Sequence, residues 1–217
     1  MKCSILLVFI LIASLSFGQD YYSTNSREFF EKGYADDTAR LENLNIELLQ
    51  AAIFHSTNLE RSKKRQFKYG KNLEKGASFH SYEMLNKVFF SHVNRKNKKY
   101  KTPSHRAEKF NADYITVGEN ILEEIALDYK DNSLYDSELI KGVYVFSHHN
   151  NGKKIRELTY KELAEKMVSS WMHSPGHKAN IMEKSYTYLG VGIALKENPY
   201  GTDDLPTIFA TQLFGGN

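Results

Sequence analysis

The most informative part of the sequence for the fold is a stretch of twelve residues, Trp171-Met172-His173-Ser174-Pro175-Gly176-His177-Lys178-Ala179-Asn180-Ile181-Met182. Pro175 ends one helix or begins the next, because proline fits the first turn of a helix and disrupts its interior. His173 and His177 are four residues apart, which would place both on one face of a continuous helix. The Pro-Gly pair between them argues against that continuity, so we expect His173 to face solvent.

A well-marked helix leads into this stretch. Thr159-Tyr160-Lys161-Glu162 is a capping box, in which the threonine hydroxyl and the glutamate carboxylate satisfy amide groups at the helix start. Leu163, Met167 and Trp171 follow at helical spacing, and we predict that they face the core.

Two strands are predicted after it. Tyr188 to Leu195 has alternating apolar positions around Gly190 and Gly192, 197–206 is a polar loop, and Thr207 to Phe214 returns as an aromatic-rich strand. Strands joined in this way are expected to be antiparallel neighbours.

Two helices are predicted upstream. The first begins at Asp37, with Asp37 or Thr38 as its cap, and the second covers Leu73 to Phe90. The basic segment 91–111 is predicted to be a loop or to hold only short helical turns. Helices on both sides of an antiparallel pair predict an α+β fold, a three-layer α-β-α sandwich with a central, mainly antiparallel sheet.

Residues 123–158 resemble an insertion. Within it, 142–148 is predicted to be a strand, Asn151-Gly152 favours a tight turn, and 153–158 is predicted to return as the partner strand.

These motifs, in this order, resemble the CAP superfamily (cysteine-rich secretory proteins, antigen 5 and pathogenesis-related class 1 proteins; the SCP domain), in its bacterial type. The resemblance covers about residues 40 to 215 and implies an α-β-α sandwich. The matching segments are Asn58-Leu59-Glu60-Arg61, Ala77–Met84, Gly118-Glu119-Asn120-Ile121, Trp171–Met182, Gly190-Val191-Gly192 and Thr211–Gly215. The residues of these motifs to which we assign a structural role are Asn58, Arg61, Gly118, Asn120, Trp171, Ser174 and Asn180.

In many eukaryotic members two histidines and two glutamates line a cleft and can hold a divalent metal. His80 and Glu119 match two of those places, whereas Ser174 and Phe209 stand where the second glutamate and the second histidine would be. His177 belongs to the bacterial-type pattern. The resemblance therefore implies a cleft with candidate ligand-binding residues His80, Glu119, His177, His92 and Gln212.

The chemistry of this set leaves two interpretations open. His80, Glu119 and His177 would make a three-ligand zinc site with an open position, as in catalytic zinc sites. The alternative is a polar cluster that closes the junction of helix and sheet through hydrogen bonds. There is no Gly-x-Ser-x-Gly or His-Glu-x-x-His motif. Ser81 follows His80 directly, but adjacent helical residues point about 100° apart. We therefore do not expect His80 to activate Ser81 as a nucleophile.

Composition excludes several classes of protein. The chain of 217 residues is about one domain, and its formal net charge of +3, or +2 without Lys2, is too weak to argue for nucleic-acid binding. The basic patches at 61–65 and 95–101 are interpreted as a solvated helix end and a loop. The single cysteine, Cys3, lies at the extreme N-terminus, so a mature chain would be stabilised without disulfides and would have no cysteine nucleophile.

Residues 1–19 are predicted to be a secretory signal peptide. The apolar run from Ile5 to Ala13 is shorter than the ~20 residues that span a bilayer, and Ser16-Phe17-Gly18 offers small residues for cleavage. The alternative is an uncleaved membrane anchor. Cleavage would leave a leader at 20–37, a domain at 38–217, and no stable membrane span.

The sequence thus predicts a secreted or cell-envelope protein and three candidate functions. The favoured one is a non-enzymatic extracellular binding module, with a lipid, a glycan or another protein as its partner. The second is a metal-assisted hydrolase that uses the same cleft, and the third is a structural component of the cell envelope. Shared fold alone does not choose between them.

Overall fold

The computed structural model describes residues 20–130 and 133–217, so the predicted signal peptide at 1–19 lies outside the described residues. The helices are α1 (Ser26–Glu31), α2 (Ile46–Leu59), α3 (Lys71–Asn86), α4 (Pro103–Lys109), α5 (Tyr160–His173) and α6 (Pro175–Met182), with short 3-10 turns η1 (Leu41–Asn43), η2 (Lys63–Arg65) and η3 (Lys98–Tyr100). The strands are β1 (Lys68–Tyr69), β2 (Thr116–Ile125), β3 (Tyr135–Ile140), β4 (Val143–His148), β5 (Tyr188–Leu195) and β6 (Thr207–Gly216).

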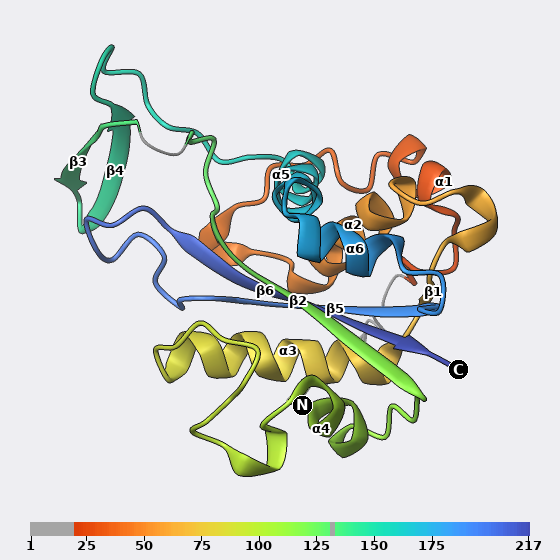
Figure 1. Cartoon of the computed structure of the whole chain (residues 1–217). Coiled ribbons are helices and arrows are strands. Elements are labelled where there is room, and N and C mark those ends of the chain that lie inside the picture. Colours follow the sequence, from red (N-terminus) through yellow and green to blue (C-terminus); the bar gives the residue numbers. More distant parts are fainter. Residues whose placement is uncertain (1–19, 131–132) are drawn as a thin grey trace, which may run out of the picture.

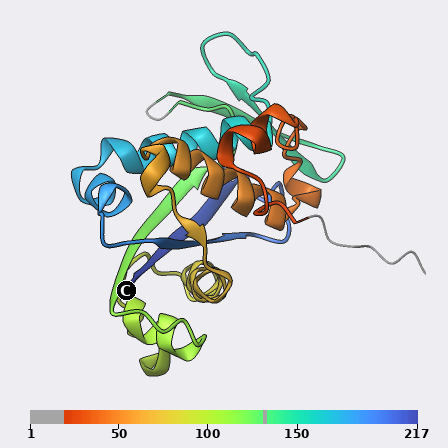
Figure 2. The ribbon, with the colours of Figure 1, turned by 90° about the vertical axis from the view of Figure 1, so that its right-hand side faces the viewer.

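The central sheet has the order β1-β5-β6-β2. Strands β5, β6 and β2 run antiparallel, and only the two-residue β1 is parallel to its neighbour β5. Helices α2, α5 and α6 cover one face of the sheet, and α3 with α4 covers the other (Figures 1 and 2). The predicted α-β-α sandwich with a mainly antiparallel sheet is confirmed.

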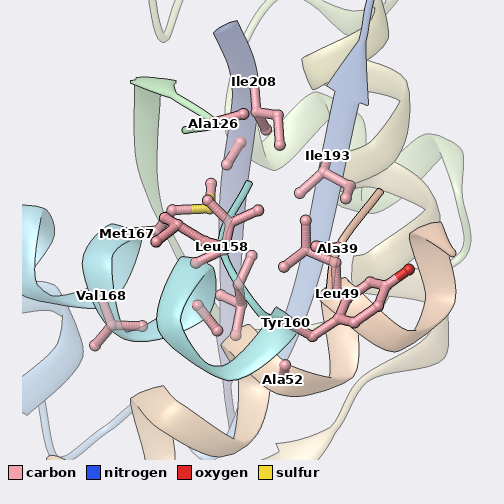
Figure 3. Packing of buried hydrophobic residues seen from close by; sticks show 14 of the residues in the cluster. Ala39, Leu49, Ala52, Ala126, Leu158, Tyr160, Met167, Val168, Ile193 and Ile208 are labelled. Atoms are coloured by element: carbon pink, nitrogen blue, oxygen red, sulfur yellow. The ribbon is translucent and has the colours of Figure 1, made fainter. Parts of the chain in front are cut away.

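The larger part of the core lies between the sheet and the helices α2 and α5. Figure 3 shows Met167 of α5 and Leu49 of α2 pointing toward Ile193 and Ile208 of the sheet, and all four side chains are buried. The predicted capping box at the start of α5 is present: the Glu162 amide donates to the Thr159 hydroxyl at 3.1 Å. The Thr159 amide donates to the Glu162 carboxylate at 2.9 Å. Local sequence signals therefore set where α5 begins and which side it buries.

Helix α3 packs directly on β5 because two glycines leave room for its backbone. A Cβ atom at Gly190 would lie 2.0 Å from the Glu74 amide nitrogen, and one at Gly192 would lie 2.0 Å from that of Ser78. Only glycine permits so close an approach of helix to strand.

Helix α2 begins nine residues later than predicted. Asn45 caps it by accepting a hydrogen bond from the Leu48 amide at 3.1 Å, and the Leu41–Asn43 segment before it is a 3-10 turn. The Asp37 region instead pairs with the chain that enters α5: Ala39 donates to the Leu158 carbonyl at 2.8 Å. A long-range backbone contact thus competes with the local helical pattern.

Helix α3 ends at Asn86, short of the predicted Phe90. Val88 adopts φ +49°, a left-handed conformation that stops a right-handed helix. Phe89 and Phe90 therefore leave the helix.

The prediction that 153–158 returns as the partner strand of 142–148 holds only in part: residues 153–155 lie antiparallel to 146–148, but they do not form a regular strand. Strand β4 pairs with β3, which precedes it, through a turn in which Lys141 and Gly142 both have positive φ angles. The Asn151-Gly152 turn does form, and the chain after it returns only as isolated bridges, Ser147 to Lys154 and Leu127 to Glu157. The β3–β4 hairpin projects from the body of the domain (Figure 1).

The segment 20–37 packs onto the domain. Phe29 of α1 is fully buried, and the buried His55 ring of α2 bonds to the Ser26 hydroxyl at 3.0 Å and to the Tyr21 carbonyl at 2.9 Å. Burial lowers the pKa of His55 to about 4.

Candidate functional site

Glu119 in the middle of β2 is the centre of a polar cluster on the α3 face of the sheet. Its carboxylate side chain is 1% exposed. One oxygen is 2.9 Å from Nδ1 of His92, and the other accepts a hydrogen bond from the guanidinium of Arg106. An ionised carboxylate only accepts, so Nδ1 of His92 carries the proton in this pair.

Arg106 of α4 neutralises this buried carboxylate. Its side chain is fully buried and also donates to the backbone carbonyls of Tyr100 at 2.9 Å and His92 at 3.0 Å. Arg106 is not predicted as a site residue from the sequence, because it stands in a segment rich in basic residues and nothing in the local pattern distinguishes it. Its pairing with Glu119 requires α4 to fold against β2.

His80 lies beneath this pair, on α3. Its ring is fully buried, with Nε2 at 3.0 Å from the Ser91 carbonyl and 3.8 Å from the nearer Glu119 oxygen. A carbonyl only accepts, so Nε2 is protonated, and Nδ1 is buried with no hydrogen-bond partner among the described residues. Burial lowers the pKa of His80 to about 4 despite the neighbouring Glu119, so the ring is neutral near pH 7.

His177 approaches the polar cluster around Glu119 from the other side of the edge strand β2. Helix α6, which carries it, is held there by Asn120, whose side-chain amide donates to the His177 carbonyl at 3.1 Å. Asn180 donates to the Glu119 carbonyl at 3.1 Å and to the Asn120 side chain at 2.9 Å. Ser174 is the residue between α5 and α6. Partial burial, with a smaller contribution from the charge of His92, lowers the pKa of His177.

Gln212 does not line this cluster. Its side chain is fully buried on the opposite face of the sheet, where it donates to the Thr57 hydroxyl at 2.8 Å and accepts from Asn120 at 3.0 Å. Successive strand residues point to opposite faces, and Gln212 pairs in register with Asn120 rather than with Glu119. The expectation that Gln212 faces the cleft was wrong.

The remaining motif residues join elements of the scaffold. Asn58 accepts from the Phe67 amide at 2.6 Å and donates to the carbonyl of the same residue at 3.1 Å. Arg61 ties the end of α2 to the end of α6 by donating to the Ile181 carbonyl at 2.6 Å. Trp171 is fully buried, with its indole N–H 3.2 Å from the Ile121 carbonyl, and a Cβ at Gly118 would meet the Tyr186 hydroxyl at 2.4 Å.

The donor set does not fit a divalent metal. Both oxygens of Glu119 already accept hydrogen bonds, one of them from a cation. Nε2 of His80 is held protonated by a carbonyl, and the free lone pair of that ring is on Nδ1, which is buried. A zinc ligand must offer a free lone pair, and the neighbouring guanidinium repels a metal ion. Within 20–130 and 133–217 no group of three or more His, Cys, Asp or Glu side chains is arranged to hold a metal ion.

An open groove of about 600 Å³ lies beside the cluster, between the end of α3 and the loop that joins β5 to β6. Phe89 separates the two: it lines the groove, and its ring centre is 6.0 Å from that of His80. Phe209 also lines it and packs at 6.3 Å from Phe90. Most of the lining is apolar, and the polar exceptions are Glu123, Lys196, Thr202, Asp204 and Thr207.

The fold and the site define a class: a three-layer α-β-α domain whose edge strand carries a buried glutamate held by histidine and arginine. The family model for the Cysteine-rich secretory protein family, CAP, matches residues 54–214. The chain belongs to the CAP family, as its motifs predicted.

The similar proteins are distant in sequence. The uncharacterized protein YkwD of Bacillus subtilis is 25% identical over 149 residues, which are 68% of this chain and 43% of that protein. An extracellular protein containing a SCP domain from Bacillus anthracis matches 79% of this chain and 41% of its own, with 21% identity and a TM-score of 0.48. An outer surface protein from Borrelia burgdorferi matches 76% of this chain and 90% of its own, with 17% identity and a TM-score of 0.44. The match to the curated relative thus spans less than half of that protein's length.

Among residues 20–130 and 133–217, no helix is both long and apolar enough to cross a bilayer.

Proposed function

We propose that this CAP domain is a non-enzymatic extracellular binding module that holds an apolar or amphiphilic ligand in the groove beside Glu119. The observation that carries the proposal is the groove itself, which is concave and largely apolar and has a volume of about 600 Å³. Binding sites for small molecules are of this size and character, with a few polar groups at the rim. The names of the related proteins, extracellular and outer surface, support the extracellular placement.

The closed polar cluster supports binding over metal chemistry. Arg106 and His92 occupy both oxygens of Glu119, and His80 donates to a backbone carbonyl. These groups stabilise the wall behind Phe89, and the Arg106 guanidinium disfavours a cation beside Glu119. The apolar lining favours a lipid-like ligand over a glycan, because sugar hydroxyls would lose hydrogen bonds to water against phenylalanine side chains.

A fluorescent fatty-acid analogue tests the groove. We expect saturable binding to the wild type and at least about tenfold weaker binding to Phe209→Ser, which removes a phenyl side chain from the lining. Leu139→Ser, at a 59% exposed position on the β3–β4 hairpin, is the control and should bind as the wild type does. Equal affinity in all three proteins would exclude the groove as the binding site.

A second candidate, a metal-free hydrolase, has one specific observation in its favour. The His92 side chain is 47% exposed, and its Nδ1 bonds to the buried Glu119 at 2.9 Å. A carboxylate that orients a histidine leaves the other ring nitrogen free to act as a general base toward water. Ester turnover that chelators leave intact and His92→Ala abolishes would establish this function; its absence favours the binding module.

A further inference from the structure

One segment of the chain concentrates positive charge. From Met84 to Ala107 there are seven Lys and Arg residues and no Asp or Glu. The whole chain has a formal charge of +3, so a segment of +7 leaves −4 for the rest. Such an asymmetry marks one side of the molecule for an anionic partner.

The fold gathers this charge into a compact loop against the end of α3. The Asn94 amide donates to the Lys101 carbonyl at 2.8 Å and closes the loop. The Asn94 side chain donates to Glu83 of α3 at 3.0 Å, and the Lys96 ammonium donates to the Lys87 carbonyl. Five basic side chains of the loop are exposed: Arg95, Lys96, Lys98, Lys99 and Lys101.

These five charges are available to a partner. Of the seven basic residues, Arg106 pairs with Glu119 and Lys87 pairs with Glu83 at 2.5 Å. None of the five exposed ones forms an ion pair with a carboxylate among the described residues.

Two apolar side chains that precede the same loop in the sequence are exposed to solvent. Val88 is 85% exposed and Phe90 is 50% exposed; both come shortly after Lys87 and also line the groove described above. Val88 adopts φ +49°, which is strained for a β-branched residue. Strain of this kind persists where the surrounding structure holds it, and it is concentrated at functional sites. We call Lys87, Val88, Phe90 and the loop 94–101 the basic edge.

We propose that the basic edge docks the protein on an anionic lipid bilayer. Exposed lysines and arginines are attracted to anionic headgroups, while valine and phenylalanine insert at the boundary between headgroups and acyl chains. A soluble polyanion would satisfy the charges but would leave Val88 and Phe90 in water. The combination therefore favours a membrane surface over an acidic polysaccharide.

Sedimentation with lipid vesicles tests whether the basic residues of the loop contribute to membrane binding. We expect binding to vesicles of equal parts phosphatidylcholine and phosphatidylglycerol, and none to phosphatidylcholine alone. Arg95→Glu/Lys98→Glu/Lys99→Glu should weaken binding by about a hundredfold or more, since each of the three basic residues contributes about fivefold near such a surface. The matched control Lys63→Glu/Lys64→Glu/Arg65→Glu makes the same charge change in the exposed η2 turn and should bind at least about tenfold more tightly than the loop variant. Equal loss in both variants, or no binding by the wild type, would overturn the proposal.

Variants of Val88 and Phe90, the apolar half of the basic edge, distinguish binding to a membrane from binding to a soluble polyanion. Val88→Ser/Phe90→Ser should lose vesicle binding but elute from a heparin column at the wild-type salt concentration, whereas the control Leu134→Ser/Leu139→Ser should change neither. Unchanged vesicle binding by Val88→Ser/Phe90→Ser would reject insertion and leave a polyanion site. Circular dichroism checks that each variant folds. The loop variant changes no residue of the groove, so its vesicle binding and fatty-acid binding can fail independently. Val88 and Phe90 line the groove, so fatty-acid binding is measured for Val88→Ser/Phe90→Ser as well. Loss of vesicle binding with fatty-acid binding retained supports insertion, and loss of both rejects it.

Discussion

At the scale of single residues, the pairing of Arg106 with Glu119 governs the candidate site. Removing one partner of a buried ion pair leaves an uncompensated charge, which costs about 3–5 kcal/mol. We therefore expect Arg106→Met to lower the free energy of unfolding by that amount, measured by urea denaturation. Lys109→Met, at an exposed position on the same helix, should change it little.

The double variant Arg106→Met/Glu119→Gln tests whether the uncompensated charge of Glu119 causes the loss of stability in Arg106→Met. Without the carboxylate there is no buried anion to neutralise, so the double variant should be more stable than Arg106→Met alone. If it is equally unstable, the arginine acts by packing and its backbone hydrogen bonds instead. The motif resemblance predicts a site at Glu119 and His80, and the structure places the two side chains 3.8 Å apart. The pairing with Arg106 could not be predicted, because the sequence does not distinguish basic side chains of the surface from those of the core.

At the scale of secondary-structure elements, the contact of α3 with β5 depends on glycine. A methyl group at position 192 would overlap the α3 backbone at 2.0 Å, so helix and strand must separate. We expect Gly192→Ala to destabilise the domain by about 3 kcal/mol or more, because backbone cannot give way as a flexible side chain can. Gly176→Ala is the matched control: nothing lies within 4 Å of its Cβ position, and thermal melting should show little change.

The elements that the sequence predicts well are those whose limits are encoded locally. The capping box at Thr159 and the alternation in 188–195 specify α5 and β5 without reference to distant residues. The start of α2 depends on a long-range contact, between Ala39 and Leu158, about which periodicity contains no information. The partner of β4 is local: β3 precedes it across the Lys141-Gly142 turn, whereas the sequence pattern favoured the Asn151-Gly152 turn on the other side of β4.

At the scale of the whole molecule, two buried neutral histidines couple stability to pH. His80 lies on the α3 face of the sheet and His55 lies on the opposite face, in α2 under α1, and burial lowers the pKa of each from its usual 6.5 to about 4. Between pH 6.5 and pH 4 the unfolded chain therefore binds two protons that the folded chain does not bind. The free energy of unfolding must fall as the pH falls through this window.

We expect this loss to approach about 3 kcal/mol for each histidine by about pH 4, since one pKa unit corresponds to about 1.4 kcal/mol. Urea denaturation at pH 7, 6 and 5 measures it, at pH values where carboxylates are still largely ionised. His55→Gln should remove half of the slope, because glutamine keeps a polar group near the Ser26 hydroxyl and cannot titrate. His149→Gln, at an exposed position, should leave the slope unchanged. A free energy of unfolding that is constant from pH 7 to pH 5 in the wild type would mean that the two rings take up protons in the folded protein, where the added proton on Nδ1 of His80 has no hydrogen-bond acceptor among the described residues.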